Sequence, residues 1–154
     1  GVGRTDFIES RLVGIKSREV YECPAATVLL EAHKDLEKTV LTRHEVMFKE
    51  LIDAEWTRLV YYGLWMEPLK QDLEGFIEKT QKRVCGKVRV KLYKGGLRVV
   101  GRSSPYSLYD YNLATYEVSS TFDQSLAKGF IELWGLPTRV ANEVMRKARP
   151  QPRP

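Results

Sequence analysis

The chain has 154 residues, of which 43% are apolar and 29% are charged, a composition typical of one globular domain with enough length for a packed core. The net charge of +5 is small and is spread among many acidic residues, so it does not by itself indicate a nucleic-acid partner. No apolar run approaches the roughly 20 residues that a membrane-spanning helix needs, and no signal peptide is recognisable, so we expect neither membrane insertion nor secretion.

The first third of the chain predicts a short strand followed by a helix. Branched and apolar residues at 11–17 are typical of a strand. Pro24 suits the first turn of a helix, where a missing N–H costs nothing. Apolar residues then recur at helical spacing, at Leu29, Ala32, Leu36 and Val40.

Two further helices are predicted next. Thr42 and Glu45 form a capping box, in which each side chain satisfies a backbone N–H of the other residue. The helix that follows should bury Phe48, Leu51, Ile52, Trp56 and Leu59. Pro68 predicts the start of the third helix and Gly86 predicts its end.

The pattern then changes to the alternation of β-strands. Residues 88–101 predict a hairpin that turns at Gly95-Gly96. The tyrosine-rich segment 107–117 predicts a turn and a strand, and residues 129–134 predict another strand. Leu136-Pro137 should open a last helix. We therefore expect an α+β fold, in which a helical run is followed by antiparallel strands and a C-terminal helix.

The common motifs of enzyme sites are missing from this sequence. It has no Gly-x-x-x-x-Gly-Lys-Ser/Thr loop and no Gly-x-Gly-x-x-Gly after a strand. His33 and His44 lack metal-ligand spacing, and Cys23 and Cys85 form no motif. We expect no metal site, no catalytic residue, and free thiols in a reducing compartment.

Two charged regions could bind a partner. The predicted hairpin carries Arg89, Lys91 and Tyr93 on one face, which suits RNA, although a solvated polar face is the simpler interpretation. The N-terminal segment crowds six charged side chains around a short strand, and this cluster fits either a zwitterionic ligand or a structural ion-pair network. Its members are Arg4, Asp6, Glu9, Arg11, Lys16 and Arg18.

Several long motifs in register resemble argininosuccinate synthase. The first is Gly-Val-Gly-Arg-x-Asp-x-x-Glu-x-Arg-x-x-Gly-x-Lys-Ser-Arg-x-x-Tyr-Glu-x-Pro, over residues 1–24. The others lie at residues 55–65 (Glu-Trp-Thr-Arg-Leu-Val-Tyr-Tyr-Gly-Leu-Trp), 80–83 (Thr-Gln-Lys-Arg) and 88–110, with Asp-Gln-Ser from 123 and Gly-Phe-Ile from 129. The resemblance extends from Gly1 to about Pro137.

The resemblance implies an ATP-dependent C–N ligase that joins citrulline to aspartate, with ATP and Mg²⁺ bound by a preceding nucleotide-binding domain. That domain's Ser-Gly-Gly-x-Asp-Thr/Ser loop does not occur here. The chain starts at Gly1 rather than at a methionine, so we expect a fragment or a processed chain. We expect this segment alone to bind no cofactor and to be inactive.

The resemblance also implies two citrulline-binding residues, Glu9 and Tyr21. A carboxylate can pair with an ammonium, and a phenol can donate or accept a hydrogen bond. The sequence departs from the family pattern at Ser10, where asparagine is common, and at Cys23, where a small or hydroxyl residue is common. Neither departure falls on the two implied positions.

The implied organisation has three parts. Residues 1–135 would be the C-terminal portion of the synthetase domain, residues 136–149 a helix that assembles a homotetramer, and residues 150–154 a disordered, proline-rich tail. Citrulline and aspartate would be the partners, and we expect the protein to bind neither nucleic acid nor membrane. The expected location is the cytoplasm. The alternative is an RNA-binding or structural oligomerisation module with no catalytic role.

Overall fold

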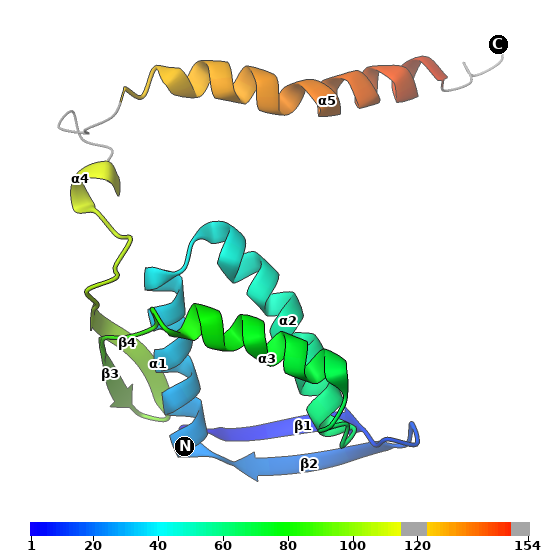
Figure 1. Ribbon diagram of the computed structural model, residues 1–154, viewed down its shortest axis with the longest axis vertical. Coiled ribbons are helices and arrows are strands. Elements are labelled where there is room, and N and C mark those ends of the chain that lie inside the picture. Colours follow the sequence, from blue (N-terminus) through cyan, green and yellow to red (C-terminus); the bar gives the residue numbers. More distant parts are fainter. Residues whose placement is uncertain (115–122, 149–154) are drawn as a thin grey trace. The chain divides into compact units, whose positions relative to one another are not determined.

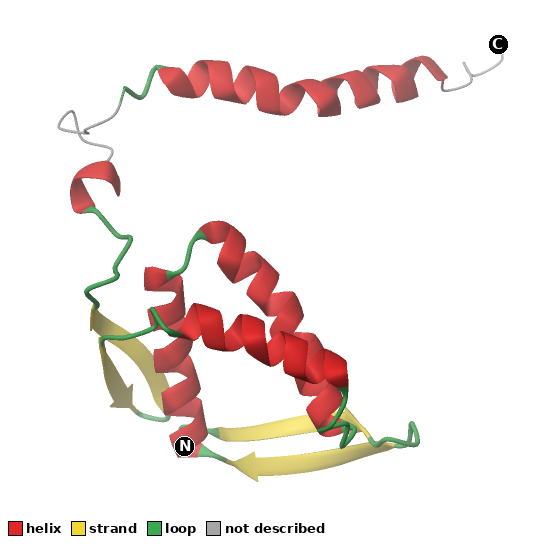
Figure 2. Cartoon of the chain, in the orientation of Figure 1, coloured by secondary structure: helices red, strands yellow, loops and turns green. Residues whose placement is uncertain are grey.

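A computed structural model of the chain describes residues 1–114 and 123–148. The chain divides into two compact units, residues 1–109 and residues 110–154, and each is described here by itself. Helices and two small antiparallel sheets make up the described residues, which confirms the predicted α+β class (Figure 2). None of the described helices is long and apolar enough to cross a membrane.

The first unit begins with a hairpin that the sequence did not predict correctly. Strands β1 (Arg4–Ser10) and β2 (Lys16–Glu22) lie side by side and pair antiparallel (Figure 1). The strand predicted at 11–17 is therefore wrong, because most of that segment is the connection between β1 and β2. Gly14 lies in this connection at a φ of 85°, a conformation that glycine adopts without steric cost.

Three helices follow, and each begins where its sequence signal predicts. They are α1 (Pro24–Val40), α2 (Arg43–Tyr61) and α3 (Pro68–Gln81). The capping box is present, since Thr42 Oγ1 accepts from the Glu45 amide at 3.3 Å and Glu45 Oε2 accepts from the Thr42 amide at 2.9 Å. Helix α3 ends at Gln81, five residues before the glycine predicted to end it.

The core of the first unit is small. Helix α1 packs against strands β3 (Lys87–Tyr93) and β4 (Gly96–Ser103), while α2 packs against α3. The buried apolar residues are Leu36, Val40, Leu41, Leu59 and Leu73. Phe48 and Leu51 were predicted to be buried but are 53% and 67% exposed, because the other elements of the first unit leave one face of α2 uncovered.

The second hairpin follows its prediction closely. Strands β3 and β4 pair antiparallel, with an irregularity in register between Arg89 and Val90. The two residues between the strands are Lys94 and Gly95, both at positive φ, rather than Gly95 and Gly96. Positive φ at both central residues is the requirement of a type I′ turn, which matches the twist of the strands.

The second unit contains α4 (Tyr111–Ala114) and α5 (Leu126–Ala148). Helix α5 corrects two predictions: residues 129–134 are helical rather than a strand, and the last helix begins at Leu126 rather than at Leu136. Pro137 lies inside the helix. The described part of segment 107–117 holds irregular backbone and α4 but no strand, and residues 115–117 and the predicted tail at 150–154 lie outside the described residues.

Candidate functional site

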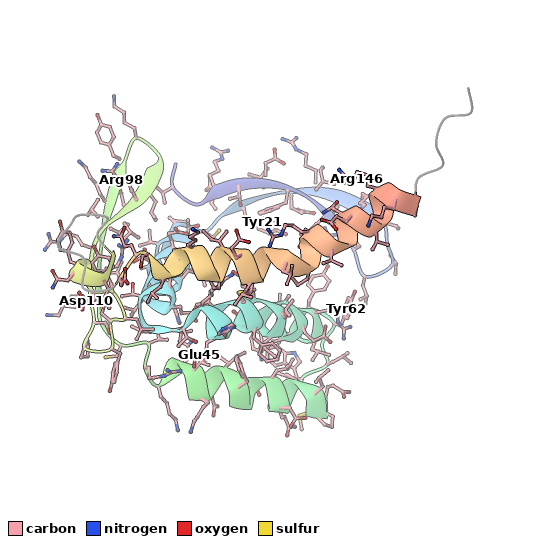
Figure 3. All side chains as sticks on the ribbon, turned by 90° about the horizontal axis from the view of Figure 1, so that it is seen from above. Tyr21, Glu45, Tyr62, Arg98, Asp110 and Arg146 are labelled. Atoms are coloured by element: carbon pink, nitrogen blue, oxygen red, sulfur yellow. The ribbon has the colours of Figure 1, made fainter. Side chains whose placement is uncertain are left out.

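The candidate site lies on one face of the β1–β2 hairpin. The register pairs Thr5 with Tyr21, Phe7 with Glu19, and Glu9 with Ser17. Directly opposed residues of an antiparallel pair project from the same side, and alternate residues of a strand share a side. Glu9, Glu19 and Tyr21 therefore project from one face, which we call the Glu9 face, and Tyr21 is labelled in Figure 3.

Four side chains of the Glu9 face form one connected cluster. The Tyr21 hydroxyl donates to Glu9 Oε2 at 2.9 Å. The Arg11 guanidinium lies between two carboxylates, with Nη1 3.3 Å from Glu9 Oε1 and Nη2 2.5 Å from Glu19 Oε1. The side chains of the two glutamates are 28% and 35% exposed, so a ligand from solvent can reach them.

The cluster keeps Tyr21 in its protonated form. The hydrogen bond to Glu9 raises the pKa of the Tyr21 hydroxyl, and desolvation and the negative charges of Glu9 and Glu19 raise it further, while Arg11 opposes them. The Phe7 ring lies 6.2 Å from the Tyr21 ring, measured between centroids, in a tilted arrangement. Tyr21 is therefore a hydrogen-bond donor held beside the Glu9 carboxylate.

The opposite face of the hairpin holds a structural ion-pair network. Arg18 binds Asp6 through Nε, at 3.0 Å from Oδ1, and through Nη2, at 2.5 Å from Oδ2. Arg4 lies 3.5 Å from Glu22, and Lys16 donates to Ser10 at 2.6 Å. The six charged residues of the N-terminal segment thus divide between two faces. Glu9 and Arg11 belong to the Glu9 face. The other four make contacts between the two strands on the opposite face, and they are Arg4, Asp6, Lys16 and Arg18.

The structure brings Glu9 and Tyr21, the two residues expected to bind citrulline, into contact, and their role in binding citrulline stays a prediction. Glu19 was missed, because the strand was predicted too early in the chain. Once β2 is recognised as Lys16–Glu22, the alternation of side chains places Glu19 and Tyr21 on the same face. Strand alternation counted back from Tyr21 is the signal that could have found it.

Two further polar contacts connect helices of the first unit. His33 Nε2 lies 2.8 Å from Gln81 Oε1, which joins α1 to the end of α3. Lys49, whose side chain is 9% exposed, bridges Glu37 and Asp53 at 3.0 and 2.6 Å. Within residues 1–114 and 123–148, no group of three His, Cys, Asp or Glu side chains could hold a metal ion.

Comparison with known proteins identifies relatives over most of the chain. The family model described as "Arginosuccinate synthase C-terminal domain" matches residues 1–141. A curated argininosuccinate synthase of Thermosynechococcus vestitus is 57% identical over 147 residues, which cover 96% of this chain and 37% of that protein. The argininosuccinate synthases of Pyrococcus furiosus and Bacillus pumilus are 58% and 56% identical, covering 94% and 96% of this chain and 35% and 36% of their own length.

The chain thus spans little more than a third of the length of the curated relatives it matches. These matches support the synthase interpretation over an RNA-binding module. The basic face of the β3–β4 hairpin is nevertheless exposed, with Tyr93 64% accessible. We interpret that face as the solvated side of a half-buried hairpin.

Proposed function

The chain belongs to the argininosuccinate synthase C-terminal domain family, and from this premise we propose that it forms the C-terminal part of an enzyme that joins citrulline to aspartate. The complete reaction consumes ATP and yields argininosuccinate, AMP and diphosphate, a step of arginine biosynthesis. The observation that carries the proposal is the contact between Glu9 and Tyr21, the two positions that the family resemblance assigns to citrulline.

The geometry of the Glu9 face supports an amino-acid ligand. An ionised carboxylate is acceptor-only, so Glu9 suits a donor group such as the α-ammonium of citrulline, with a ureido N–H as the alternative. The Tyr21 hydroxyl donates to Glu9 Oε2, and Arg11 forms an ion pair with Oε1 at 3.3 Å. These contacts orient the Glu9 carboxylate before a ligand binds, which favours affinity.

We place ATP and its Mg²⁺ on the part of the polypeptide outside this chain. The sequence carries no glycine-rich phosphate loop. The side chains described here do not fit a metal ion either, since they form no cluster of three suitable ligands. The role proposed for this chain is therefore limited to binding citrulline and to assembly.

Assembly is proposed to be a homotetramer formed through α5. The helix has a broad apolar side that no other described element of its own unit covers, and Leu133, Trp134 and Val144 are 74%, 72% and 60% accessible. So much exposed apolar surface on one helix is typical of a binding interface. We also propose a cytoplasmic location, because the exposed free thiols of Cys23 and Cys85 suit a reducing compartment.

The proposal is tested by the reaction itself. A full-length polypeptide that ends in this chain, supplied with citrulline, aspartate, ATP and Mg²⁺, should form argininosuccinate and AMP in equal amounts. Omitting citrulline or aspartate should stop the formation of argininosuccinate, and residues 1–154 alone should form none. A full-length protein that folds but makes no argininosuccinate would contradict the enzyme and favour a structural oligomerisation module.

A further inference from the structure

The Glu9 face contains a charged side chain to which the proposed function assigns no role. Glu19 lies across the hairpin from Phe7 and touches the site only through Arg11. Its carboxylate lies 2.5 Å from Arg11 Nη2, which is closer than Glu9 is to Nη1 of the same guanidinium, at 3.3 Å. Arg11 therefore donates a hydrogen bond to Glu19 and forms only an ion pair with Glu9, the residue expected to meet the ligand.

The charges of the cluster explain why this matters. Arg11 holds Glu9 in place, but its positive charge also cancels the charge of that carboxylate. A neutral pair would attract a cation weakly, because the interaction of an ammonium with one partner would be offset by its repulsion from the other. With Glu19 included, two carboxylates and one guanidinium leave one net negative charge on the face.

We propose that Glu19 is a positioning residue that neutralises Arg11, so that the Glu9 face keeps a net negative charge and selects the α-ammonium of its amino-acid substrate. This inference rests on the proposed function, since it concerns the same site. It also decides between the two groups of citrulline that Glu9 could meet. The ureido group is neutral and the carboxylate is repelled, so the ammonium is the group that the charge favours.

A second observation agrees with this account. The negative charge of Glu19 contributes to raising the pKa of Tyr21, after the larger effects of Glu9 and of desolvation. The field of Glu19 therefore extends to the Tyr21 hydroxyl, which donates to Glu9 at 2.9 Å. A ligand ammonium beside Glu9 would experience the same field.

Four full-length proteins test the proposal: the wild type, Glu19→Gln, Arg11→Gln, and the double variant Arg11→Gln/Glu19→Gln. Glu19→Gln makes the face neutral, and we expect it to raise the citrulline KM about three- to tenfold with little change in kcat. The double variant regains one net negative charge, so its citrulline KM should fall below that of Glu19→Gln. Arg11→Gln, which leaves two negative charges, should not raise the citrulline KM as much as Glu19→Gln does.

The required control is 5-ureidopentanoate, the analogue of citrulline without the α-amino group. Its inhibition constant should not rise in Glu19→Gln, because it carries no ammonium. The ATP KM should stay constant in all four proteins, which excludes misfolding as the cause. The Arg11 and Glu19 side chains are 51% and 35% exposed, so the substitutions disturb no core.

Three results would overturn the inference. They are an unchanged citrulline KM in Glu19→Gln, a double variant no better than Glu19→Gln, or an equal loss of affinity for citrulline and for its des-amino analogue. Glu9→Gln distinguishes these failures from failure of the proposed function. If Glu9→Gln raises the citrulline KM while Glu19→Gln does not, the citrulline site stands and only the role of Glu19 is wrong.

Discussion

Gly3 connects the start of β1 to the start of α1, and its replacement by alanine tests how closely the two are joined. Its φ is 74°, and an added Cβ would lie 2.6 Å from both Cα and N of Pro24. The carbonyl of Gly3 also accepts a hydrogen bond from the Cys23 amide at 2.9 Å. The neighbouring atoms belong to the backbone, so they cannot rotate away as a side chain would.

The loss in free energy of unfolding expected for Gly3→Ala is the sum of two separate costs. A residue with a Cβ in the left-handed region costs about 1–2 kcal/mol. The overlap with Pro24 forces a shift of backbone at the helix start, and we expect a total loss for Gly3→Ala of about 3 kcal/mol or more. Gly14→Ala is the matched control, because Gly14 has a φ of 85° but no neighbour within 4 Å of an added Cβ. It should lose only about 1–2 kcal/mol.

Urea titration of the full-length variants, followed by circular dichroism, measures both losses in free energy of unfolding. Gly3→Ala should unfold at a clearly lower urea concentration than Gly14→Ala, with an unchanged dependence on urea. The difference between the two variants isolates the overlap from the cost of positive φ. Equal destabilisation of the two variants would refute the close approach of β1 to α1.

Two further predictions concern acid stability and assembly. Hydrogen bonds from the Thr42 amide and from Arg83 lower the pKa of Glu45 below its ordinary 4.5, so this stabilisation is present above pH 4.5 and is lost as the pH falls through the folded pKa. Glu45→Gln should therefore make the thermal midpoint of the full-length protein less sensitive to pH below 4.5, and an unchanged acid dependence in melting curves would contradict the assignment. Removing residues from Leu126 onward should lower the number of subunits per assembly, as measured by light scattering, while the rest of the protein stays folded. A truncated protein that remains a tetramer on dilution would show that α5 is not the interface.

The helix starts of the first unit were predictable because each has a local chemical cause. Proline at a first turn and a threonine with a glutamate three residues later act within one turn of helix, whatever the rest of the fold does. The place of the β3–β4 turn was predictable from its glycines, but its central residues were not, since Lys94 and not Gly96 takes the other position of positive φ. The exposure of Phe48 and Leu51 was not, because periodicity predicts an apolar face but not what covers it.

The β1–β2 hairpin escaped prediction because its strands lack an apolar face. Asp6 and Arg18 bind each other across the strands, and Glu9 and Tyr21 do so on the other side. Side-chain pairs of this kind stabilise a hairpin without alternating hydrophobicity, so the usual strand signal is absent. Segment 11–17 has the branched and apolar residues typical of a strand, but most of it forms the connection between β1 and β2 instead.

In helix α5 the error is the reverse, because the sequence carries strand signals where the structure has a helix. Phe130, Ile131 and Trp134 have the aromatic and branched character of a strand, and Pro137 resembles a helix start. The helical period of the apolar residues continues through Pro137, although this proline removes one backbone hydrogen bond and its ring crowds the carbonyl of Leu133. Rings of Phe130 and Trp134, four residues apart, stack with centroids 5.4 Å apart on one side of the helix.

The candidate site was predictable only in part. Glu9 and Tyr21 came from the resemblance to a family, because a carboxylate and a phenol twelve residues apart carry no signal of their own. The contact between Arg11 and Glu19 depends on the register of β1 and β2. Since that register was not predicted, the role of Glu19 could not be reached from the sequence.

The most direct test of the central claim is the citrulline KM of Glu9→Gln in the full-length enzyme, measured beside the ATP KM. Loss of one charge-assisted hydrogen bond should raise the citrulline KM about tenfold to a hundredfold or more, and Tyr21→Phe should raise it less. The ATP KM should change little, because ATP binds elsewhere. An unchanged citrulline KM in Glu9→Gln would contradict the account and would assign the Glu9 face to structural ion pairing alone.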